Sequence, residues 1–318
     1  MAQKIVVEKW DEAQGLVHCK ELEKGNILYF PEIPFAFPQE EIDFLLEQRQ
    51  GRAKGRKNIA YKPEGDQITN HDSIDQVAAE RLRGVLRQYS QRVTDFLGKV
   101  MVPYAQGWKR DYASFRPFQE KGRVLRMRAR NDLLHVDAFP TRPVHGARIL
   151  RFFTNIHPTE GRRWVTSEPF DVLAEKYAGS AKLPFPGPVG YSLKDRLRQK
   201  MKEMLRSVGW KMALRSPYDC FMLRMHNFLK ENGTFQQECA KDHWEFPPRS
   251  CWAVFTDMVS HAALSGQYAL EQTFLVPEKA LVHPEMSPVS VLERLTGGNM
   301  VNVQYSEALF HANACARP

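Results

Sequence analysis

A histidine and an aspartate two positions apart, His135 and Asp137, are the residues of this chain best placed to do chemistry. They follow two leucines, and a β-like run from Arg148 to Asn155 comes shortly after them. Side chains two positions apart on a strand point to the same face, so this imidazole and this carboxylate can bind one metal ion together. Two such ligands and one later histidine form the facial triad typical of non-haem Fe(II) oxygenases, which leaves neighbouring metal positions open.

The same spacing occurs twice more, at His243–Glu245 and at His283–Glu285, but prolines lie beside both and favour loops or strand edges. The third ligand that we predict is His261, which ends a β-like run from Ser250 and precedes a glycine turn into another such run. The alternative interpretation of His135 and Asp137 is a buried, hydrogen-bonded histidine beside a turn aspartate.

Three arginines alternate with apolar residues just before this motif. Arg126, Arg128 and Arg130 would face one way on a strand, and Leu125, Met127 and Ala129 the other. The pattern is compatible with a solvated strand face. It is equally compatible with an arginine-lined wall that binds carboxylates or phosphates, which arginine holds with two parallel hydrogen bonds.

The surrounding segments predict a sheet-rich fold interrupted by helices. β-like pieces occur at 4–7, 26–30, 250–263 and 268–276, with a short helix at 38–48 and a long amphipathic helix that opens with a capping box at 73–76. Helices that start near 167, 192 and 216 separate the β-like runs, and we interpret them as an insertion of the kind that often forms a substrate lid. A last helix is expected at 288–295, followed by a loose tail.

Composition narrows the class of protein. With 43% hydrophobic and 26% charged residues among 318, the chain should bury a sizeable core. A net charge of +8, with a basic loop at 51–57, favours an anionic partner such as nucleic acid, an acidic membrane surface or a charged substrate. We see no aromatic and basic stacking platform for nucleic acid and therefore expect no such partner. Without a signal peptide, a membrane span or a disulfide-like cysteine pattern, the sequence predicts a cytoplasmic protein.

Three runs of sequence resemble the Kdo hydroxylase family: HVDAFPTRP at 135–143, GARILRFFTN at 146–155 and SHAALSGQYALEQTF at 260–274. The resemblance implies an Fe(II)/2-oxoglutarate-dependent dioxygenase that also uses O2, with His135, Asp137 and His261 as the iron ligands. It further implies hydroxylation of Kdo, the acidic sugar of lipopolysaccharide, at C3 to give Ko, with release of succinate and CO2. The implied partner is Kdo-lipid A or a related anionic glycolipid, with peripheral contact to the inner face of the inner membrane.

The distal carboxylate of 2-oxoglutarate needs a buried cation. Many related enzymes place an arginine about ten residues after the distal histidine, but Glu271 stands there in this chain. The candidates for binding this co-substrate are Arg151, Arg148 and Asn155 on the strand after His-x-Asp, of which we prefer Arg151. Arg126, Arg128 and Arg130 are the candidates for reading the substrate's carboxylate.

We therefore predict an α+β protein with a double-stranded β-helix (jelly-roll) core, flanking helices and a helical insertion. Its expected parts are 1–105, with N-terminal strands and a long helix packed on the core, 106–280 as the oxygenase core with an insertion at 167–232, and 281–318 as a C-terminal helix and tail. The alternatives are an oxygenase acting on protein or nucleic acid, and a non-enzymatic jelly-roll module that binds anionic glycolipid. The sequence does not predict the oligomeric state.

Overall fold

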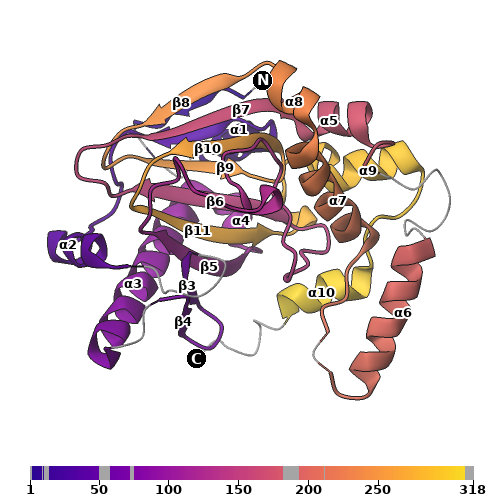
Figure 1. Ribbon diagram of the computed structural model, residues 1–318, viewed down its shortest axis with the longest axis horizontal. Helices are drawn as coiled ribbons and strands as arrows, with labels where there is room; N and C mark the ends of the chain where they lie inside the picture. The colour runs from indigo at the N-terminus through magenta and orange to yellow at the C-terminus, as the bar shows by residue number, and fades with distance from the viewer. Residues whose placement is uncertain are drawn as a thin grey trace.

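Two β-sheets face each other in the computed structural model, which describes residues 2–8, 10, 14–49, 58–71, 75–181, 193–210 and 212–311. The large sheet has the order β1-β2-β9-β6-β11-β5-β3-β4, and the small one β10-β7-β8 (Figure 1). An isolated antiparallel bridge between His135 and His261 adds the 135–137 segment beside β10. The strands are β1 Lys4–Val6, β2 Ile27–Phe30, β3 Ile59–Lys62, β4 Gln67–Thr69, β5 Lys109–Arg116, β6 Arg148–Asn155, β7 Arg162–Pro169, β8 Asp242–Phe246, β9 Cys251–Phe255, β10 Val259–Ser265 and β11 Ala269–Val276.

Helices cover the outer face of the large sheet and fill the connection between β7 and β8. Figure 1 shows α1, α3 and α4 behind the large sheet, and α6 at the edge of the molecule. The predicted double-stranded β-helix with flanking helices and a helical insertion is confirmed. The helices are α1 Gly15–Glu23, α2 Gln39–Glu47, α3 Gln76–Val100, α4 Val102–Ala105, α5 Phe170–Tyr177, α6 Leu193–Ser207, α7 Pro217–Glu231, α8 Gly233–Glu238, α9 Pro288–Thr296 and α10 Val303–His311. No described helix is long and apolar enough to cross a membrane.

The alternation of β6 divides the interior of the protein into two packed layers. Phe152 points to the helical layer, where its ring lies 5.7 Å from Phe30 and 6.0 Å from Phe96 of α3. Phe153 points into the barrel, where its ring stacks 5.1 Å from Trp252. Each such buried side chain stabilises the fold by roughly 1.5–3 kcal/mol through its removal from water. The barrel layer supports the small sheet, because Trp164 of β7 packs on the same aromatic cluster.

Several expectations from the sequence were wrong or incomplete. The 124–130 segment is not a strand, because no neighbouring strand pairs with it among the described residues, and Met127–Ala129 forms a 3₁₀ turn instead. The C-terminal tail is not uniformly loose, since α10 covers Val303–His311. Helix α1 and the hairpin β3–β4 were not predicted. The capping residue of α3 is Asp75, whose side chain accepts a hydrogen bond from the Val77 amide. Residues 73 and 74 of the predicted capping box, and the whole basic loop at 51–57, lie outside the described residues.

A buried ion pair fixes the start of β6 against the turn between β9 and β10. Nε of Arg148 lies 2.9 Å from Oδ2 of Asp257, and both side chains have no exposed surface. Removing one partner of such a pair leaves an uncompensated buried charge. We expect Asp257→Ala to lower the free energy of unfolding in urea by about 3–5 kcal/mol.

Two controls separate charge from packing. Glu32→Ala, at an exposed position, should change the free energy of unfolding by less than about 0.5 kcal/mol. The double variant Arg148→Met/Asp257→Leu should recover most of the loss, because it removes both charges while keeping the volume filled. A loss below about 1 kcal/mol in Asp257→Ala would show that the pair does not stabilise the strand.

Candidate metal centre

The backbone brings two of the predicted ligands side by side. The amide of His135 donates to the carbonyl of His261 at 3.1 Å, and the amide of His261 donates back at 2.9 Å. Residues paired in this way on antiparallel strands carry their side chains on the same face, and the two imidazole centroids are 4.7 Å apart. Asp137, two residues along, has Oδ1 3.6 Å from Nε2 of His135 and Oδ2 4.0 Å from Nε2 of His261. All three predicted ligands therefore meet at one point.

A third imidazole, that of His226 on α7, reaches the same point. Ligating atoms of His135, Asp137 and His226 all lie within 4.8 Å of one another, so among the described residues this group could also hold a metal ion. The His226 ring lies edge-on to that of His135, with centroids 4.8 Å apart. Sequence reasoning did not find His226 as a candidate, because it falls among apolar residues of a helix and only the packing of α7 brings it beside His135.

Backbone carbonyls set the tautomer of all three histidines. Nδ1 lies 2.7 Å from the Leu133 carbonyl in His135, 3.0 Å from that of Val259 in His261, and 2.8 Å from that of Val136 in His226. A carbonyl can only accept, so each Nδ1 carries the proton and each Nε2 keeps a free lone pair. This arrangement is the one that metal-binding histidines use.

The electrostatics hold these groups in the protonation states that a metal requires. Burial lowers the pKa of His135 well below 6.5, lowers that of His261, and lowers that of His226 to about 4. Burial alone would raise the pKa of Asp137, but the charge of Arg151 and the contact with His135 outweigh it and hold the pKa well below 3.8. Oδ2 of Asp137 is buried without a well-formed hydrogen bond, although Nε of Arg151 is 3.2 Å away. Neutral imidazoles and an under-satisfied carboxylate fit a divalent cation such as Fe(II).

Three arginines and two glutamates line or border the small cavity beside these ligands. Arg151 bridges Asp137 and Glu271, with NH1 2.9 Å from Oε1 of Glu271. Arg116 at the end of β5 contacts Glu271 at 2.7 Å and Glu120 at 3.3 Å. Arg162 at the start of β7 is 3.4 Å from Glu120, and burial lowers its pKa to about 10. The cavity thus concentrates cations that can receive a carboxylate.

The remaining candidate residues have other surroundings. Arg148 pairs with Asp257 and is not among the residues that line the cavity. The Asn155 side chain donates to the carbonyls of Glu160, Phe246 and Pro247 and accepts from the amide of His157, so its contacts are those of a structural residue.

The arginines before the motif lie at the surface of the 3₁₀ turn. Arg128 is paired with Glu231 of α7 at 2.6 Å, and Arg130 with Asp132 at 2.7 Å, while Arg126 is exposed. The sequence missed Arg116 and Arg162, because nothing local distinguishes them from surface arginines and only the closure of the barrel turns them inward.

Comparisons with known proteins identify what the chain resembles. The family model described as 3-deoxy-D-manno-oct-2-ulosonic acid (Kdo) hydroxylase matches residues 7–299. The apo structure of the Kdo hydroxylase KdoO, a non-haem Fe(II) α-ketoglutarate-dependent dioxygenase, is 31% identical, with a TM-score of 0.80 over 94% of this chain and 97% of that one. The complex of KdoO with α-ketoglutarate and Fe(III) matches with the same identity, coverage and TM-score, and the complex with succinate and Fe(III) has a TM-score of 0.78. A search of curated proteins found no match.

A buried lysine, Lys230, lies one helical turn after His226 and should make the protein's stability depend on pH. Lys230 is 4% exposed and donates to the Arg128 carbonyl at 3.2 Å. Burial lowers its pKa to about 8, against the pull of Asp137 and Asp132. Between pH 8 and pH 10.5, the pKa of a lysine in the unfolded chain, Lys230 is protonated in the unfolded protein but largely neutral in the folded one. The contribution of Lys230 to the free energy of unfolding therefore rises with pH in this range. We expect Lys230→Met to raise the free energy of unfolding of the metal-free protein by up to about 3 kcal/mol at pH 7, an advantage that fades by about pH 10.5.

The measurement is urea unfolding of both proteins at intervals between pH 7 and 10.5. Lys99→Met, at an exposed position of α3, controls for the loss of one positive charge. A difference between Lys230→Met and the wild type that does not change with pH would contradict the assignment.

Proposed function

The chain belongs to the Kdo hydroxylase family, and we propose that it hydroxylates C3 of a Kdo residue to give Ko, with Fe(II), 2-oxoglutarate and O2. One observation carries the proposal. The imidazoles of His135 and His261 and the carboxylate of Asp137 converge where the 135–137 segment pairs with β10, in the protonation states that a metal needs. The chain that holds them matches this family over residues 7–299.

We propose that Nε2 of His135, the carboxylate of Asp137 and Nε2 of His261 hold the iron. When bound, Fe(II) supplies adjacent open positions for a chelating 2-oxo acid and for O2, together with the oxidising chemistry. The protein's own contribution is to keep the three ligands deprotonated and oriented. Arg151 fixes the carboxylate of Asp137, and the Leu133 and Val259 carbonyls fix the two rings.

We propose that Arg151 receives the distal carboxylate of 2-oxoglutarate, with Arg116 and Arg162 nearby. Arg151 comes from β6, as the sequence predicted, and it is the arginine that contacts a metal ligand directly. Glu271 also contacts Arg116 at 2.7 Å, so Arg151 could turn to an incoming carboxylate without leaving Glu271 unpaired. Arg148 and Asn155 are less suited, given the contacts that they already make.

The substrate that we propose is Kdo-lipid A or a related anionic glycolipid. Its sugar carboxylate and lipid A phosphates suit a chain of net charge +8. Arg126, Arg128 and Arg130 remain our candidates for contacting these anions. Arg128 and Arg130 form exposed ion pairs that a substrate anion can exchange at little cost, since such surface pairs are worth at most about 1 kcal/mol. Peripheral association with an anionic membrane surface would bring the protein to this substrate.

The identity of the ligands can be tested by metal binding. We expect His261→Ala to weaken Co(II) binding by about 100-fold or more and to change the visible absorption of bound Co(II), because it removes a direct ligand. His226→Ala should weaken binding by no more than about tenfold, as expected of a neighbouring group.

His243→Ala is the matched control, since His243 is exposed on β8 in one of the other histidine motifs, and it should leave Co(II) binding unchanged. If His226→Ala bound Co(II) more weakly than His261→Ala, the proposed triad would be replaced by His135, Asp137 and His226.

The reaction is tested by succinate release and product mass with the Fe(II)-loaded protein, 2-oxoglutarate and O2, with and without Kdo-lipid A. We expect a product 16 Da heavier and a release rate stimulated by the glycolipid. Asp137→Ala should abolish both. Arg151→Met should raise KM for 2-oxoglutarate about ten- to a hundredfold, the value of one charge-assisted contact.

Arg163→Met is the matched control for Arg151, because Arg163 is exposed on β7, where it pairs with Glu245 at the surface. It should leave KM unchanged. Turnover without stimulation by Kdo-lipid A would keep the oxygenase chemistry and reject the substrate. A Co(II)- and Fe(II)-binding protein without any turnover would favour a non-enzymatic glycolipid-binding module.

A further inference from the structure

Helix α6 is oriented with its polar side toward the protein. Asp195 is paired with Arg224 of α7 at 2.6 Å, Gln199 donates to the Arg215 carbonyl, and Lys202 donates to the Ala213 carbonyl at 2.9 Å. Residues 195, 199 and 202 are spaced by four and three positions and so lie along one face of the helix. An ordinary surface helix turns its apolar face to the core, and α6 does the reverse.

The opposite face of α6 presents large apolar side chains to solvent. Leu197, Met201, Met204 and Val208 are spaced by four, three and four positions, about half a turn away from the polar face. Together with Trp210 they are between 55% and 71% exposed. A contiguous apolar stripe of this kind marks an interaction site, whereas single exposed apolar residues do not.

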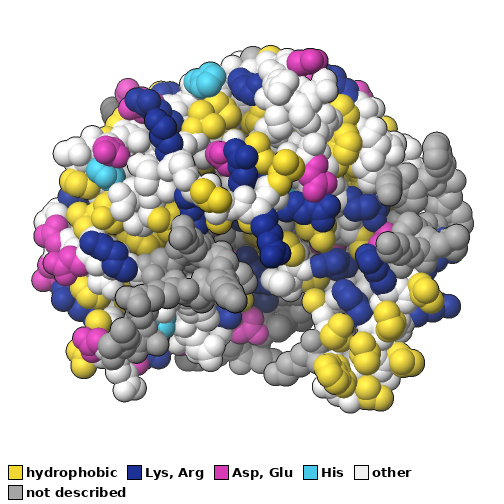
Figure 2. Space-filling view, viewed as in Figure 1, with side chains coloured by type: hydrophobic (Ala, Val, Ile, Leu, Met, Phe, Trp, Pro, Cys, Tyr) yellow, Lys and Arg dark blue, Asp and Glu magenta, His cyan; other side chains and the backbone are white. Residues whose placement is uncertain are grey.

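Positive charge borders this stripe on both sides. Arg196 and Lys200 lie on one flank and Arg198 on the other, and all three are exposed. Of the acidic residues on the helix, Asp195 is paired with Arg224, which leaves Glu203 as the exposed one. Figure 2 shows hydrophobic side chains gathered over the end of α6, with Lys and Arg side chains between them and the middle of the same face.

We propose that α6, with Val208 and Trp210, is a docking arm that lies in the headgroup region of an anionic lipid bilayer. An apolar stripe flanked by basic residues on an otherwise polar helix is the pattern of helices that bind in the membrane interface. Trp210 suits the boundary, because indole rings favour the level of the headgroups. The inference rests on the proposed function only in the reason for docking, which is that the substrate is a membrane glycolipid.

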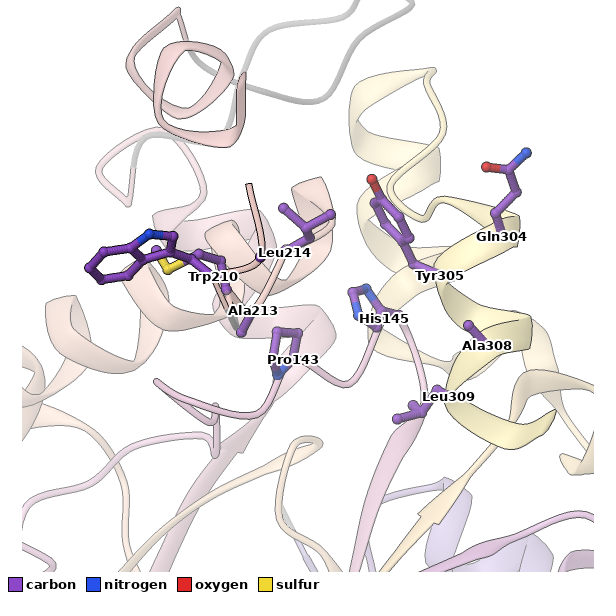
Figure 3. A pocket seen from close by; sticks show the side chains of 11 residues that line it. Pro143, His145, Trp210, Ala213, Leu214, Gln304, Tyr305, Ala308 and Leu309 are labelled. Carbon is purple, nitrogen blue, oxygen red and sulfur yellow. The ribbon is translucent and has the colours of Figure 1, made fainter. Parts of the chain in front are cut away.

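The surface next to the arm is also apolar and hollowed. A cavity of about 840 Å³ separates residues 209, 210 and 212–214 from α10, and Figure 3 shows Trp210, Ala213 and Leu214 on one side of it and His145, Tyr305 and Ala308 on the other. Apolar surface therefore extends from the outer face of α6 past Trp210, which gives the bilayer more than one helix face to contact.

A second copy of the chain fits this surface less well than a bilayer. Two stripes packed against each other would bring the basic flanks of both helices together, and like charges at an interface oppose association. Anionic phospholipid instead neutralises Arg196, Arg198 and Lys200 while the apolar side chains enter the acyl boundary.

Vesicle binding tests the arm. We would measure the sedimentation of the full-length protein with sucrose-loaded vesicles of phosphatidylcholine alone, or of phosphatidylcholine with one quarter phosphatidylglycerol, at physiological salt. We expect binding to the anionic vesicles, and a partition coefficient at least about tenfold lower in Leu197→Glu/Met204→Glu. Both positions are exposed, so the double variant should fold, which circular dichroism checks.

Val17→Glu/Val77→Glu is the matched control. These valines are 56% and 78% exposed on α1 and α3, and the substitutions add the same charge away from α6. The control should bind vesicles as the wild type does. The proposal would be overturned if the α6 variant and the control bound vesicles equally well. It would also be overturned if analytical centrifugation showed that the wild type associates with itself through α6 and does not bind vesicles.

Activity separates the arm from the proposed function. In the α6 variant, hydroxylation of a water-soluble Kdo saccharide should be unchanged, while hydroxylation of Kdo-lipid A in vesicles should fall in step with the loss of vesicle binding. If the wild type binds anionic vesicles through α6 but modifies no Kdo substrate, the arm stands and the proposed function fails. If both Kdo substrates are modified and vesicle binding does not depend on α6, the function stands and the arm fails.

Discussion

The candidate metal centre depends on two backbone hydrogen bonds between His135 and His261. These bonds join the 135–137 segment to β10 and thereby place residues that are far apart in the sequence on one face of the small sheet. A shift of one residue in this pairing would turn one imidazole to the opposite face, because side chains alternate along an extended chain. The stacking of Trp164 on His261, with ring centroids 5.3 Å apart, anchors the same pairing to the aromatic cluster between the sheets.

Charge balance is the second constraint on this interior. Burying a single arginine or carboxylate costs several kcal/mol, so Arg116, Arg151 and Arg162 are tolerable only with Asp137, Glu120 and Glu271 among them. The network also bears on how an anionic co-substrate could bind. Glu271 contacts both Arg116 and Arg151, so Arg151 could turn to an incoming carboxylate while Glu271 keeps Arg116 as its partner.

The sequence predicted the parts of the site that follow from local periodicity. His135 and Asp137 share a face because a strand repeats every two residues, and the β-like run before the glycine turn predicted His261 as the third ligand. Arg151 was preferred over Arg148 from the same alternation, and the two do lie on opposite faces of β6. Periodicity failed where no partner was present. Residues 124–130 alternate as a strand would, yet an extended segment needs a neighbour to satisfy its backbone, and the chain turns there instead.

Other parts of the site could not be predicted, because they depend on elements that meet only in the folded protein. His226 reaches the candidate metal centre because α7 packs beside the 135–137 segment, where Nδ1 of His226 lies 2.8 Å from the carbonyl of Val136. Arg116 and Arg162 come from the ends of different strands and share one glutamate. The exposed stripe of α6 is a further case, since its helical spacing is that of an ordinary core-facing helix. Only the contacts of the polar face reveal which side faces the protein.

Helix α7 connects the candidate metal centre with helix α6. His226 and Arg224 are two positions apart, which on a helix places them about 200° apart and so on nearly opposite faces. His226 faces the metal centre, and Arg224 holds Asp195 of α6. The capping box of Ser216 and Asp219 fixes the start of α7, and Asp219 also accepts from the Val144 and His145 amides of the loop that leads from the metal ligands into β6. The insertion therefore holds α6 at a set position relative to the proposed iron ligands, so that a bilayer bound by α6 would lie at a defined place with respect to the candidate metal centre.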